Sequence, residues 1–150
     1  MTRPTELEIS GRAQLGPDEW VLHFGYGRNP IPMNGPKGNW RARGRMTAAV
    51  KDQALKLAIY ARIPEMSRCR AQLTWWVATS HKRDVDNLGL FEKPIYDALV
   101  LAGVVRDDTP EYMDKPRPVI RHLRDAGGLL SEPGFTLHVT RLVELEEIEL

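Results

Sequence analysis

Three aspartates and a lysine are the residues of this chain whose types and spacing could carry out chemistry. Asp84 and Asp86 stand two residues apart, shortly after an apolar stretch that predicts a strand, and Asp108 follows a later helical stretch. In extended backbone the side chains at i and i+2 point to the same face, so we expect the first two carboxylates to lie together. The helix between them and Asp108 is long enough to return the chain toward the pair.

Two carboxylates so close together repel each other, which would raise at least one pKa unless a positive charge lies between them. An all-oxygen site that keeps water positions favours Mg²⁺, with Mn²⁺ as a substitute, over zinc. We therefore expect Asp84, Asp86 and Asp108 to bind Mg²⁺ and to support phosphodiester hydrolysis, in which the metal activates a water molecule.

The pair also has readings that need no metal. Aspartates in a loop often cap the start of a helix, so Asp84 and Asp86 could serve Asn87 and the residues after it. The Asp-x-Asp pattern also occurs in glycosyltransferases and in haloacid-type phosphatases, but those folds need longer chains. An EF-hand loop requires a polar ligand and then a glycine where this chain has Leu88 and Gly89, so that reading fails.

Charge is segregated along the chain although the formal net charge is only +1. Residues 28–83 carry twelve Lys and Arg against two acids, whereas residues 84–114 carry eight acids against two basic residues. A basic surface beside an acidic pocket suits a protein that binds phosphate chains and one cation. A chain with solvated charges of both signs would have the same composition.

Residues 27–45 hold Gly, Pro, Asn and basic residues with little hydrophobic periodicity, which predicts a long basic loop. Trp40 lies in this stretch and could either stack on an unpaired base or fold back on the core. We expect DNA contacts from the loop and from the polar run after the predicted strand. The candidate residues are Arg28, Asn34, Lys37, Trp40, Arg41, Arg43, Arg45, Lys82 and Arg83.

The hydrophobic pattern predicts one α/β (α+β) domain over residues 1–150, with two main helices packed on a small mixed sheet. Amphipathic spacing predicts a first helix over 47–62 and a second that begins near 92–94, after a lead-in turn over 87–91, with Gly103 at its C-terminal cap. Alternation and apolar runs predict strands over 20–26, 71–79, 119–123 and 135–143. The acidic tail 144–150 could fray or pack on a partner chain.

Composition limits the setting of the protein. The apolar stretches are too short for a membrane helix, and the first six residues lack the apolar region of a signal peptide. Cys69 is the single cysteine, so we expect neither an intrachain disulfide nor a cysteine zinc site. These features favour the cytoplasm, or the host cytoplasm if a phage encodes the chain, and we expect no membrane partner and no small-molecule cofactor.

Residues 83–108 resemble a known family. An Arg-Asp-x-Asp-Asn-Leu box at 83–88, a lysine four residues before Asp-Ala-Leu, then Ala-Gly and an Asp-Asp pair together look like the RusA-type Holliday-junction resolvases. Asn34 resembles the Pro-x-x-Asn entry of that family more loosely. One departure is that Asp86 and Asp97 stand three residues further apart than in the bacterial pattern, with Pro94 added between them. The interval of four from Lys93 to Asp97 is retained.

The resemblance implies an intertwined homodimer that resolves four-way DNA junctions by paired symmetric nicks with 5′-phosphate and 3′-hydroxyl ends. It implies that Asp84, Asp86 and Asp108 hold the metal, that Lys93 acts in the active site and that Arg83 contacts DNA. The family is common on mobile and viral genomes. A junction has approximate two-fold symmetry, so cutting opposite strands requires two related sites, and each chain offers one.

Other functions remain open at this point. The chain could be a nuclease for other branched or single-stranded DNA, or a DNA-binding accessory protein without activity. Lys93 could form only a surface ion pair with Asp97. An enzyme that processes nucleotide sugars or phosphates is a further reading, and it predicts a deep pocket at the Asp-x-Asp pair rather than an open basic face.

Overall fold

The long strand β3 (Arg68–Val77) is the centre of the sheet in the computed structural model, which describes residues 13–33 and 39–143. The sheet has six strands in the order β1-β2-β6-β3-β4, and β5 also pairs with β3. β3 runs antiparallel to β6 and parallel to β4 and β5. The other strands are β1 (Gln14–Gly16), β2 (Glu19–Phe24), β4 (Met113–Asp114), β5 (Val119–His122) and β6 (Gly134–Leu142).

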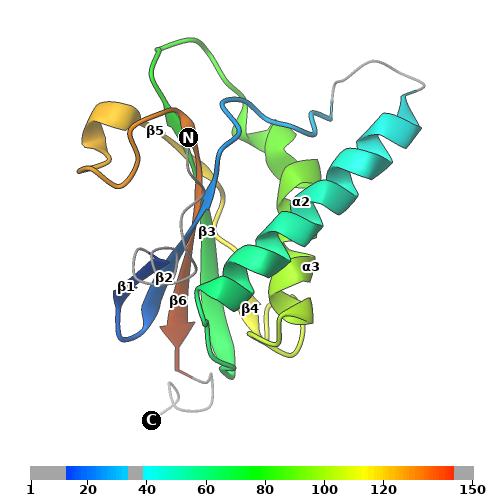
Figure 1. Ribbon diagram of the computed structural model, residues 1–150, viewed down its shortest axis with the longest axis vertical. Helices are drawn as coiled ribbons and strands as arrows, with labels where there is room; N and C mark the ends of the chain where they lie inside the picture. Colours follow the sequence, from blue (N-terminus) through cyan, green and yellow to red (C-terminus); the bar gives the residue numbers. More distant parts are fainter. Residues whose placement is uncertain (1–12, 34–38, 144–150) are drawn as a thin grey trace.

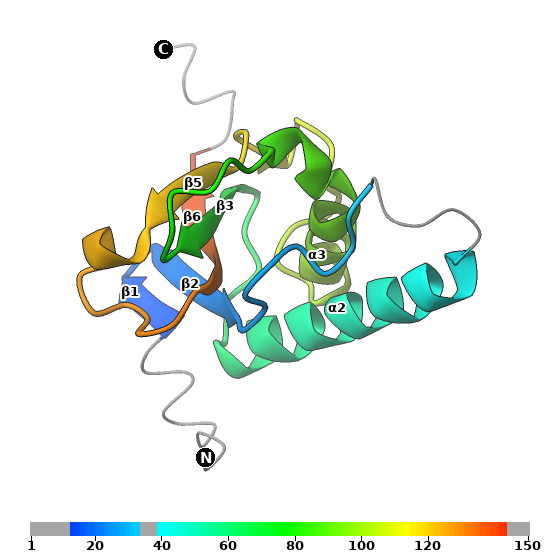
Figure 2. The same ribbon diagram turned by 90° about the horizontal axis from the view of Figure 1, so that it is seen from above.

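Two α-helices cover one face of this sheet (Figures 1 and 2). They are α2 (Trp40–Tyr60) and α3 (Gly89–Leu101), and they pack against each other. Two short 3₁₀ helices complete the elements, η1 (Val85–Leu88) directly before α3 and η2 (Leu123–Asp125) directly after β5. The helices and the sheet therefore form two layers around one core.

The core lies between the sheet and the helices because alternate residues of β3 face the helices. Cys69, Ala71, Leu73, Trp75 and Val77 belong to the buried cluster, and the residues between them point to the other face. Aromatic rings close the core near the end of β3. The contacts are Phe91 against Phe24 and Phe135, with ring centroids 6.0 and 4.7 Å apart, and Trp75 stacked on Phe135 at 5.1 Å. Each fully buried aromatic or aliphatic side chain stabilises the fold by about 1.5–3 kcal/mol.

The predicted fold class is confirmed, since the chain is a single small domain with a mixed sheet and two helices. The four predicted strands correspond to β2, β3, β5 and β6, with ends that differ by up to three residues. β1 and β4 were not predicted because three and two residues are too short for a hydrophobic period. Within the described residues, no helix is both long and apolar enough to cross a membrane.

The boundary predicted between the basic loop and the first helix was wrong. α2 begins at Trp40 rather than Thr47, so residues 40–45 are helical. The first two turns extend beyond the core, and their exposed residues carry no apolar stripe that a sequence pattern could reveal. Arg, Ala and Met nevertheless favour helix, which is sufficient where the helix continues into a packed segment. Residues 34–38 of the predicted loop and the acidic tail 144–150 lie outside the described residues.

The predicted start of the second helix was also wrong. α3 begins at Gly89, and η1 leads directly into it, so Pro94 lies inside the helix. Pro94 is buried beside Phe91 and Ile95, and this packing offsets part of the cost of a proline that lacks an N–H. The predicted role of Gly103 is confirmed, because it has φ +82° just after the helix.

Candidate active site

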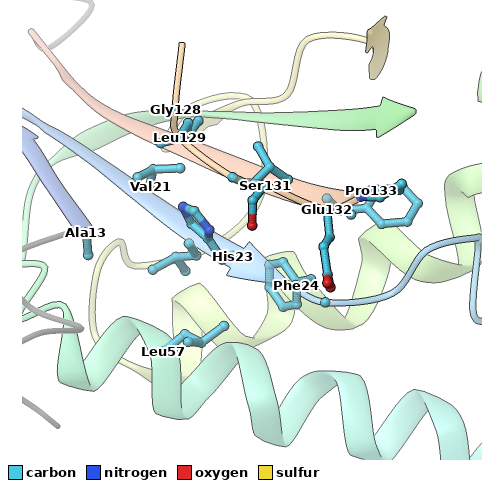
Figure 3. Close-up of a pocket in the computed structure, with 15 residues that line it drawn as sticks. Ala13, Val21, His23, Phe24, Leu57, Gly128, Leu129, Ser131, Glu132 and Pro133 are labelled. Atoms are coloured by element: carbon cyan, nitrogen blue, oxygen red, sulfur yellow. The ribbon is translucent and has the colours of Figure 1, made fainter. Parts of the chain in front are cut away.

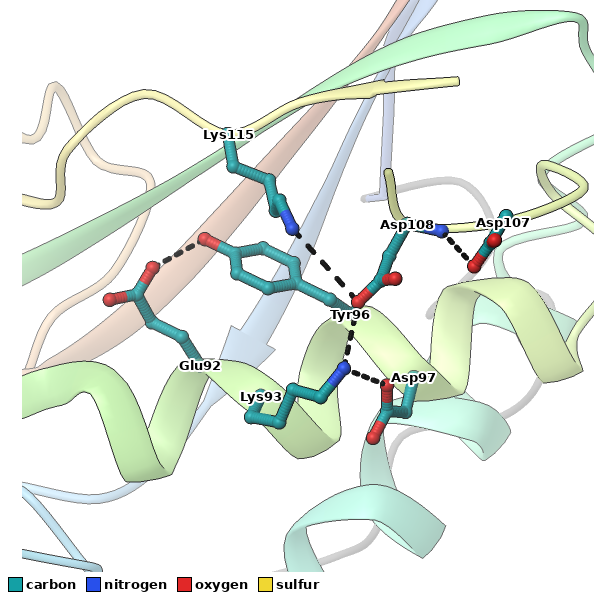
Figure 4. A network of polar contacts seen from close by, with 7 residues as sticks. All are labelled: Glu92, Lys93, Tyr96, Asp97, Asp107, Asp108 and Lys115. Carbon is teal, nitrogen blue, oxygen red and sulfur yellow. Dashed lines mark hydrogen bonds and ion pairs between the residues drawn. The ribbon is translucent and has the colours of Figure 1, made fainter. Parts of the chain in front are cut away.

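Lys93 and Asp108 meet where the chain returns past α3. The Lys93 ammonium donates a hydrogen bond to Asp108 Oδ2 at 3.0 Å, although the two residues are 15 apart in the sequence (Figure 4). Lys93 lies one and a half turns into α3, and Asp108 lies in the loop after it. The helix length predicted that Asp108 returns toward Asp84 and Asp86, but among the described residues these three carboxylates do not form a group that could hold a metal ion.

The same ammonium also contacts Asp97 Oδ1 at 2.9 Å, one helical turn further along α3. The ion pair considered from the sequence is therefore present, and it coexists with the contact to Asp108. Hydrogen bonds that Lys93 donates to Asp97 and then to Asp108 raise the pKa of Lys93, so the amine is held in its charged form. The hydrogen bond from Lys93 in turn lowers the pKa of Asp108. The pair is accordingly ionised at neutral pH.

A second lysine approaches Asp108 from the other side. Lys115 Nζ lies 3.9 Å from Asp108 Oδ2 and 5.4 Å from the centre of the Tyr96 ring (Figure 4). The Tyr96 hydroxyl donates a short hydrogen bond to Glu92 Oε2. Burial raises the pKa of Glu92, while the Tyr96 hydrogen bond and the Lys115 charge oppose this rise. The Lys115 ammonium therefore lies near the Tyr96 ring and near the carboxylates of Asp108 and Glu92.

Asp84 and Asp86 do not share a face of extended backbone, contrary to the prediction. Asp84 is extended, but it is the N-cap of η1, and its Oδ1 accepts a hydrogen bond from the Asp86 N–H at 2.9 Å. Asp86 lies inside the 3₁₀ helix, where the period is three rather than two. The capping role considered for these aspartates thus applies to Asp84. Asp86 Oδ1 instead accepts from Arg117 at 2.8 Å.

The three predicted metal ligands are not gathered into one set in this arrangement. Among residues 13–33 and 39–143, no group of three acidic, histidine or cysteine side chains stands close enough to hold a metal ion. Side-chain cations supply the counter-charge that the sequence argument assigned to a metal: Lys93 and Lys115 at Asp108, and Arg117 at Asp86. The hydrogen bond from Lys93 is the main reason that the pKa of Asp108 is lowered.

The donor chemistry of these carboxylates nevertheless fits a hard cation. Asp84, Asp86 and Asp108 each use one oxygen in the contacts above. Oxygen atoms of exposed carboxylates with water at the remaining positions are what Mg²⁺ prefers.

Asn87 has a structural role that its position in the motif did not reveal. Its Oδ1 accepts a hydrogen bond from the Met33 N–H at 2.8 Å, and its backbone oxygen accepts from Asn29 Nδ2 at 2.9 Å. Asn29 Oδ1 also accepts from the Ile31 N–H at 3.0 Å. Asn87 therefore connects residues 29–33, which follow β2, to η1, and these hydrogen bonds fix the position of that segment next to Asp84 and Asp86.

Arg83 is engaged by its own loop. Its guanidinium donates to the backbone oxygens of Thr79 and His81 at 3.0 and 2.8 Å, and to Thr79 Oγ1 at 2.7 Å. It also lies 5.5 Å from the centre of the Trp75 ring. These contacts shape the loop between β3 and η1, so Arg83 has a clear structural function whether or not it touches DNA.

The remaining predicted DNA contacts that the structure describes are on the surface. Trp40 is 70% exposed at the start of α2, so it does not fold back on the core, and Arg41 lies 5.3 Å from its ring centre. The other exposed candidates are Arg28, Arg43, Arg45 and Lys82. Asn34 and Lys37 lie outside the described residues. The exposed Trp40 ring is therefore available for stacking on a base.

Sequence reasoning missed Lys115, Arg117, Tyr96 and Glu92. The count of the acidic block stopped at Asp114, one residue before Lys115-Pro116-Arg117-Pro118. A pair of basic residues that alternates with prolines was a signal that could have been noticed, because such a segment is stiff and displays its charges. Tyr96 and Glu92 are four apart in the second helix, which is the spacing of side chains that meet.

A separate cavity of about 790 Å³ lies along β2, between α2 and the loop before β6 (Figure 3). Within the described residues, β1 pairs with only the first two residues of β2. The lining is mostly apolar and includes Leu57, Leu129 and Phe135, with Glu132 and His23 among the polar residues. None of Asp84, Asp86, Lys93 and Asp108 lines this cavity.

No protein-family model matches the chain, and no curated protein matches it.

Proposed function

We propose that this chain is a Mg²⁺-dependent DNA endonuclease that cuts branched DNA, four-way junctions above all. One observation carries the proposal. Lys93 reaches Asp108 at 3.0 Å across 15 residues, and both belong to the stretch that resembles the junction resolvases. The side chain of Lys93 is 63% exposed, so the contact is not required to fill the core. Active-site pairing accounts for an exposed charged contact between these particular residues.

In this proposal Asp84, Asp86 and Asp108 would hold Mg²⁺, which requires the three carboxylates to come closer together than they lie in this structure. The chemistry that the ion supplies when bound is neutralisation of the phosphate charge and a lowered pKa for an attacking water. Lys93 remains protonated through its two aspartate contacts and stabilises the charge that develops on the phosphate oxygens. The products expected from the resemblance carry 5′-phosphate and 3′-hydroxyl ends.

DNA binding would come from the exposed basic residues around the start of α2 and the loop after β3. Each phosphate contact releases counterions, so affinity should fall steeply as salt rises. Trp40 is available to stack on a base that lacks a partner at a branch point. This combination favours a branched substrate over a uniform duplex.

Two related functions compete with junction cutting. A nuclease for forks or single strands would use the same residues, and a cleavage panel of junctions, forks and duplexes separates these substrates. A DNA-binding protein without activity would not need the three carboxylates. The reading as a nucleotide-sugar or phosphate enzyme predicts a deep pocket at the Asp-x-Asp pair, and the cavity beside β2 contains neither Asp84 nor Asp86.

The decisive experiment compares junction cleavage by the wild type and Asp86→Asn, with and without Mg²⁺. We expect Asp86→Asn to lose cleavage at least 100-fold, while junction binding without Mg²⁺ stays equal or becomes tighter because a negative charge is removed. Asp18→Asn is the matched control. Asp18 is also an exposed aspartate paired with an arginine, at 3.0 Å from Arg141, and it lies on the turn before β2.

Asp18→Asn should cut like the wild type. Cleavage by Asp86→Asn at the wild-type rate would defeat the metal assignment. If the wild type cuts no branched or single-stranded DNA in Mg²⁺ or Mn²⁺, the nuclease proposal is wrong.

A further inference from the structure

Residues 115–118, Lys-Pro-Arg-Pro, form a short segment between β4 and β5 that we name the basic strap. Lys115 and Arg117 each precede a proline, which restricts both to extended backbone, and each proline has a fixed φ. The strap loses little conformational freedom when it binds a ligand, because most of that freedom is already absent.

The strap is also anchored to the sheet. Gln72 on β3 donates from Nε2 to the Arg117 backbone oxygen at 2.7 Å, and Pro118 is buried. β4 and β5 pair with β3 on either side of the strap, so both of its ends are fixed. Its two cationic side chains therefore project from a rigid backbone.

Both cations of the strap lie on candidate metal-binding carboxylates. Arg117 contacts Asp86 at 2.8 Å, and Lys115 lies 3.9 Å from Asp108. The Arg117 and Asp86 side chains are 68% and 74% exposed, and exposed ion pairs of this kind contribute little to stability. Such contacts exchange readily for a ligand of higher charge.

We propose that the basic strap binds backbone phosphates of DNA at the candidate active site, with Lys115 and Arg117 moving from the carboxylates to the phosphates as DNA arrives. This inference rests on the proposed function, since it takes DNA as the ligand. It adds two DNA-contacting residues. It also explains why Lys115 and Arg117 contact Asp108 and Asp86: without DNA the two cations pair with these carboxylates, and with DNA they pair with phosphates. The alternative is that the strap only neutralises these carboxylates.

The first test measures binding of a four-way junction by the full chain in EDTA over a range of salt. Lys115→Gln/Arg117→Gln should weaken binding at least tenfold and reduce the slope of log affinity against log salt by about two, one for each lost phosphate contact. Lys56→Gln/Arg141→Gln is the charge-matched control, because both residues form exposed ion pairs away from the strap. An equal loss in the control, or no loss in the strap variant, overturns the proposal.

The second test repeats the substitution in an Asp86→Asn/Asp108→Asn background, which removes the two aspartate carboxylates that the strap contacts. Phosphate binding predicts the same loss of affinity and the same change in slope as in the wild-type background. A cation that only neutralises the aspartates predicts no loss there, and that result rejects the strap as a DNA contact. Far-ultraviolet circular dichroism and a urea melt confirm that each variant folds.

These measurements need no cleavage, so the two proposals can fail separately. Normal junction binding by the strap variant, together with Mg²⁺-dependent cutting by the wild type, rejects the strap and leaves the nuclease. A reduced slope for the strap variant without cutting by any form of the protein rejects the nuclease and leaves a DNA-binding strap. A wild type that fails to bind DNA overturns both.

Discussion

At the scale of single residues, Lys93 is the most informative side chain of the site. It contacts Asp97 and Asp108 at 2.9 and 3.0 Å, and these two hydrogen bonds raise its pKa. The contact with Asp97 is local to the helix and exists in many helices without function. The contact with Asp108 joins two parts of the chain and cannot arise from helix geometry alone. Substitutions of Lys93 and of Asp97 should therefore affect cleavage differently.

We predict that Lys93→Gln lowers single-turnover junction cleavage by at least 100-fold while binding changes less than threefold, because the positive charge is needed chiefly in the transition state. Asp97→Asn is its control and should change cleavage only a few-fold, with a loss of unfolding free energy of at most about 0.5 kcal/mol. The measurement is a quench-flow time course at saturating protein. Equal losses in the two variants would reduce Lys93 to a surface ion pair.

At the scale of elements, the end of α3 determines where Asp108 lies. The Gly103 N–H donates to the Val100 oxygen and the Val104 N–H donates to the Leu99 oxygen, both at 3.0 Å. This pair of bonds is the Schellman motif, and it requires the left-handed backbone that Gly103 adopts at φ +82°. The turn sends the chain back toward the sheet, where the Met66 N–H donates to the Val104 oxygen at 2.8 Å.

We predict that Gly103→Ala lowers the unfolding free energy by about 1 kcal/mol, because a Cβ is disfavoured in the left-handed region. Gly89→Ala is the matched control at the other end of α3. Gly89 has φ −57°, and an added Cβ would meet the Met33 sulfur at an ordinary 3.7 Å. Alanine should be neutral or stabilising there. Urea unfolding followed by circular dichroism decides, and a Gly103→Ala variant as stable as the wild type would contradict the role of this turn.

At the scale of the whole molecule, one chain offers one candidate site, and paired cutting of a four-way junction needs two sites related by two-fold symmetry. The sheet has helices on one face only (Figure 2), so a monomer leaves the other face without a helical layer. We propose that the working form is a homodimer. This remains a prediction, because the described structure is a single chain.

The dimer is tested by light scattering, which should give twice the 17.0 kDa mass of the chain at micromolar concentration. Co-expressed dimers with one wild-type and one Asp86→Asn chain should nick one strand of a junction without resolving it, since each site cuts one strand. Symmetric resolution by the mixed dimer, or a monomer that resolves junctions, would contradict the paired-site proposal.

Much of the fold was determined by local pattern. The alternation of β3 and the apolar runs of β2, β5 and β6 depend on burial of one or both faces of a strand, and that requirement is visible in single residues. Gly103 was predictable for the same reason, because its backbone conformation excludes most other residues. The residues of the candidate site were also chosen from the sequence, because burial in a core does not explain the spacing of these charged side chains.

Only the tertiary structure decided which charges face each other. The sequence predicted that Asp84 and Asp86 share one face, but Asp84 caps η1 and Asp86 lies inside it. The sequence could not predict the contact between Arg117 and Asp86, which are 31 residues apart, because no local periodicity relates a loop to the start of a helix. Long-range ion pairs depend on how helices and sheet pack, and packing is a property of the whole chain.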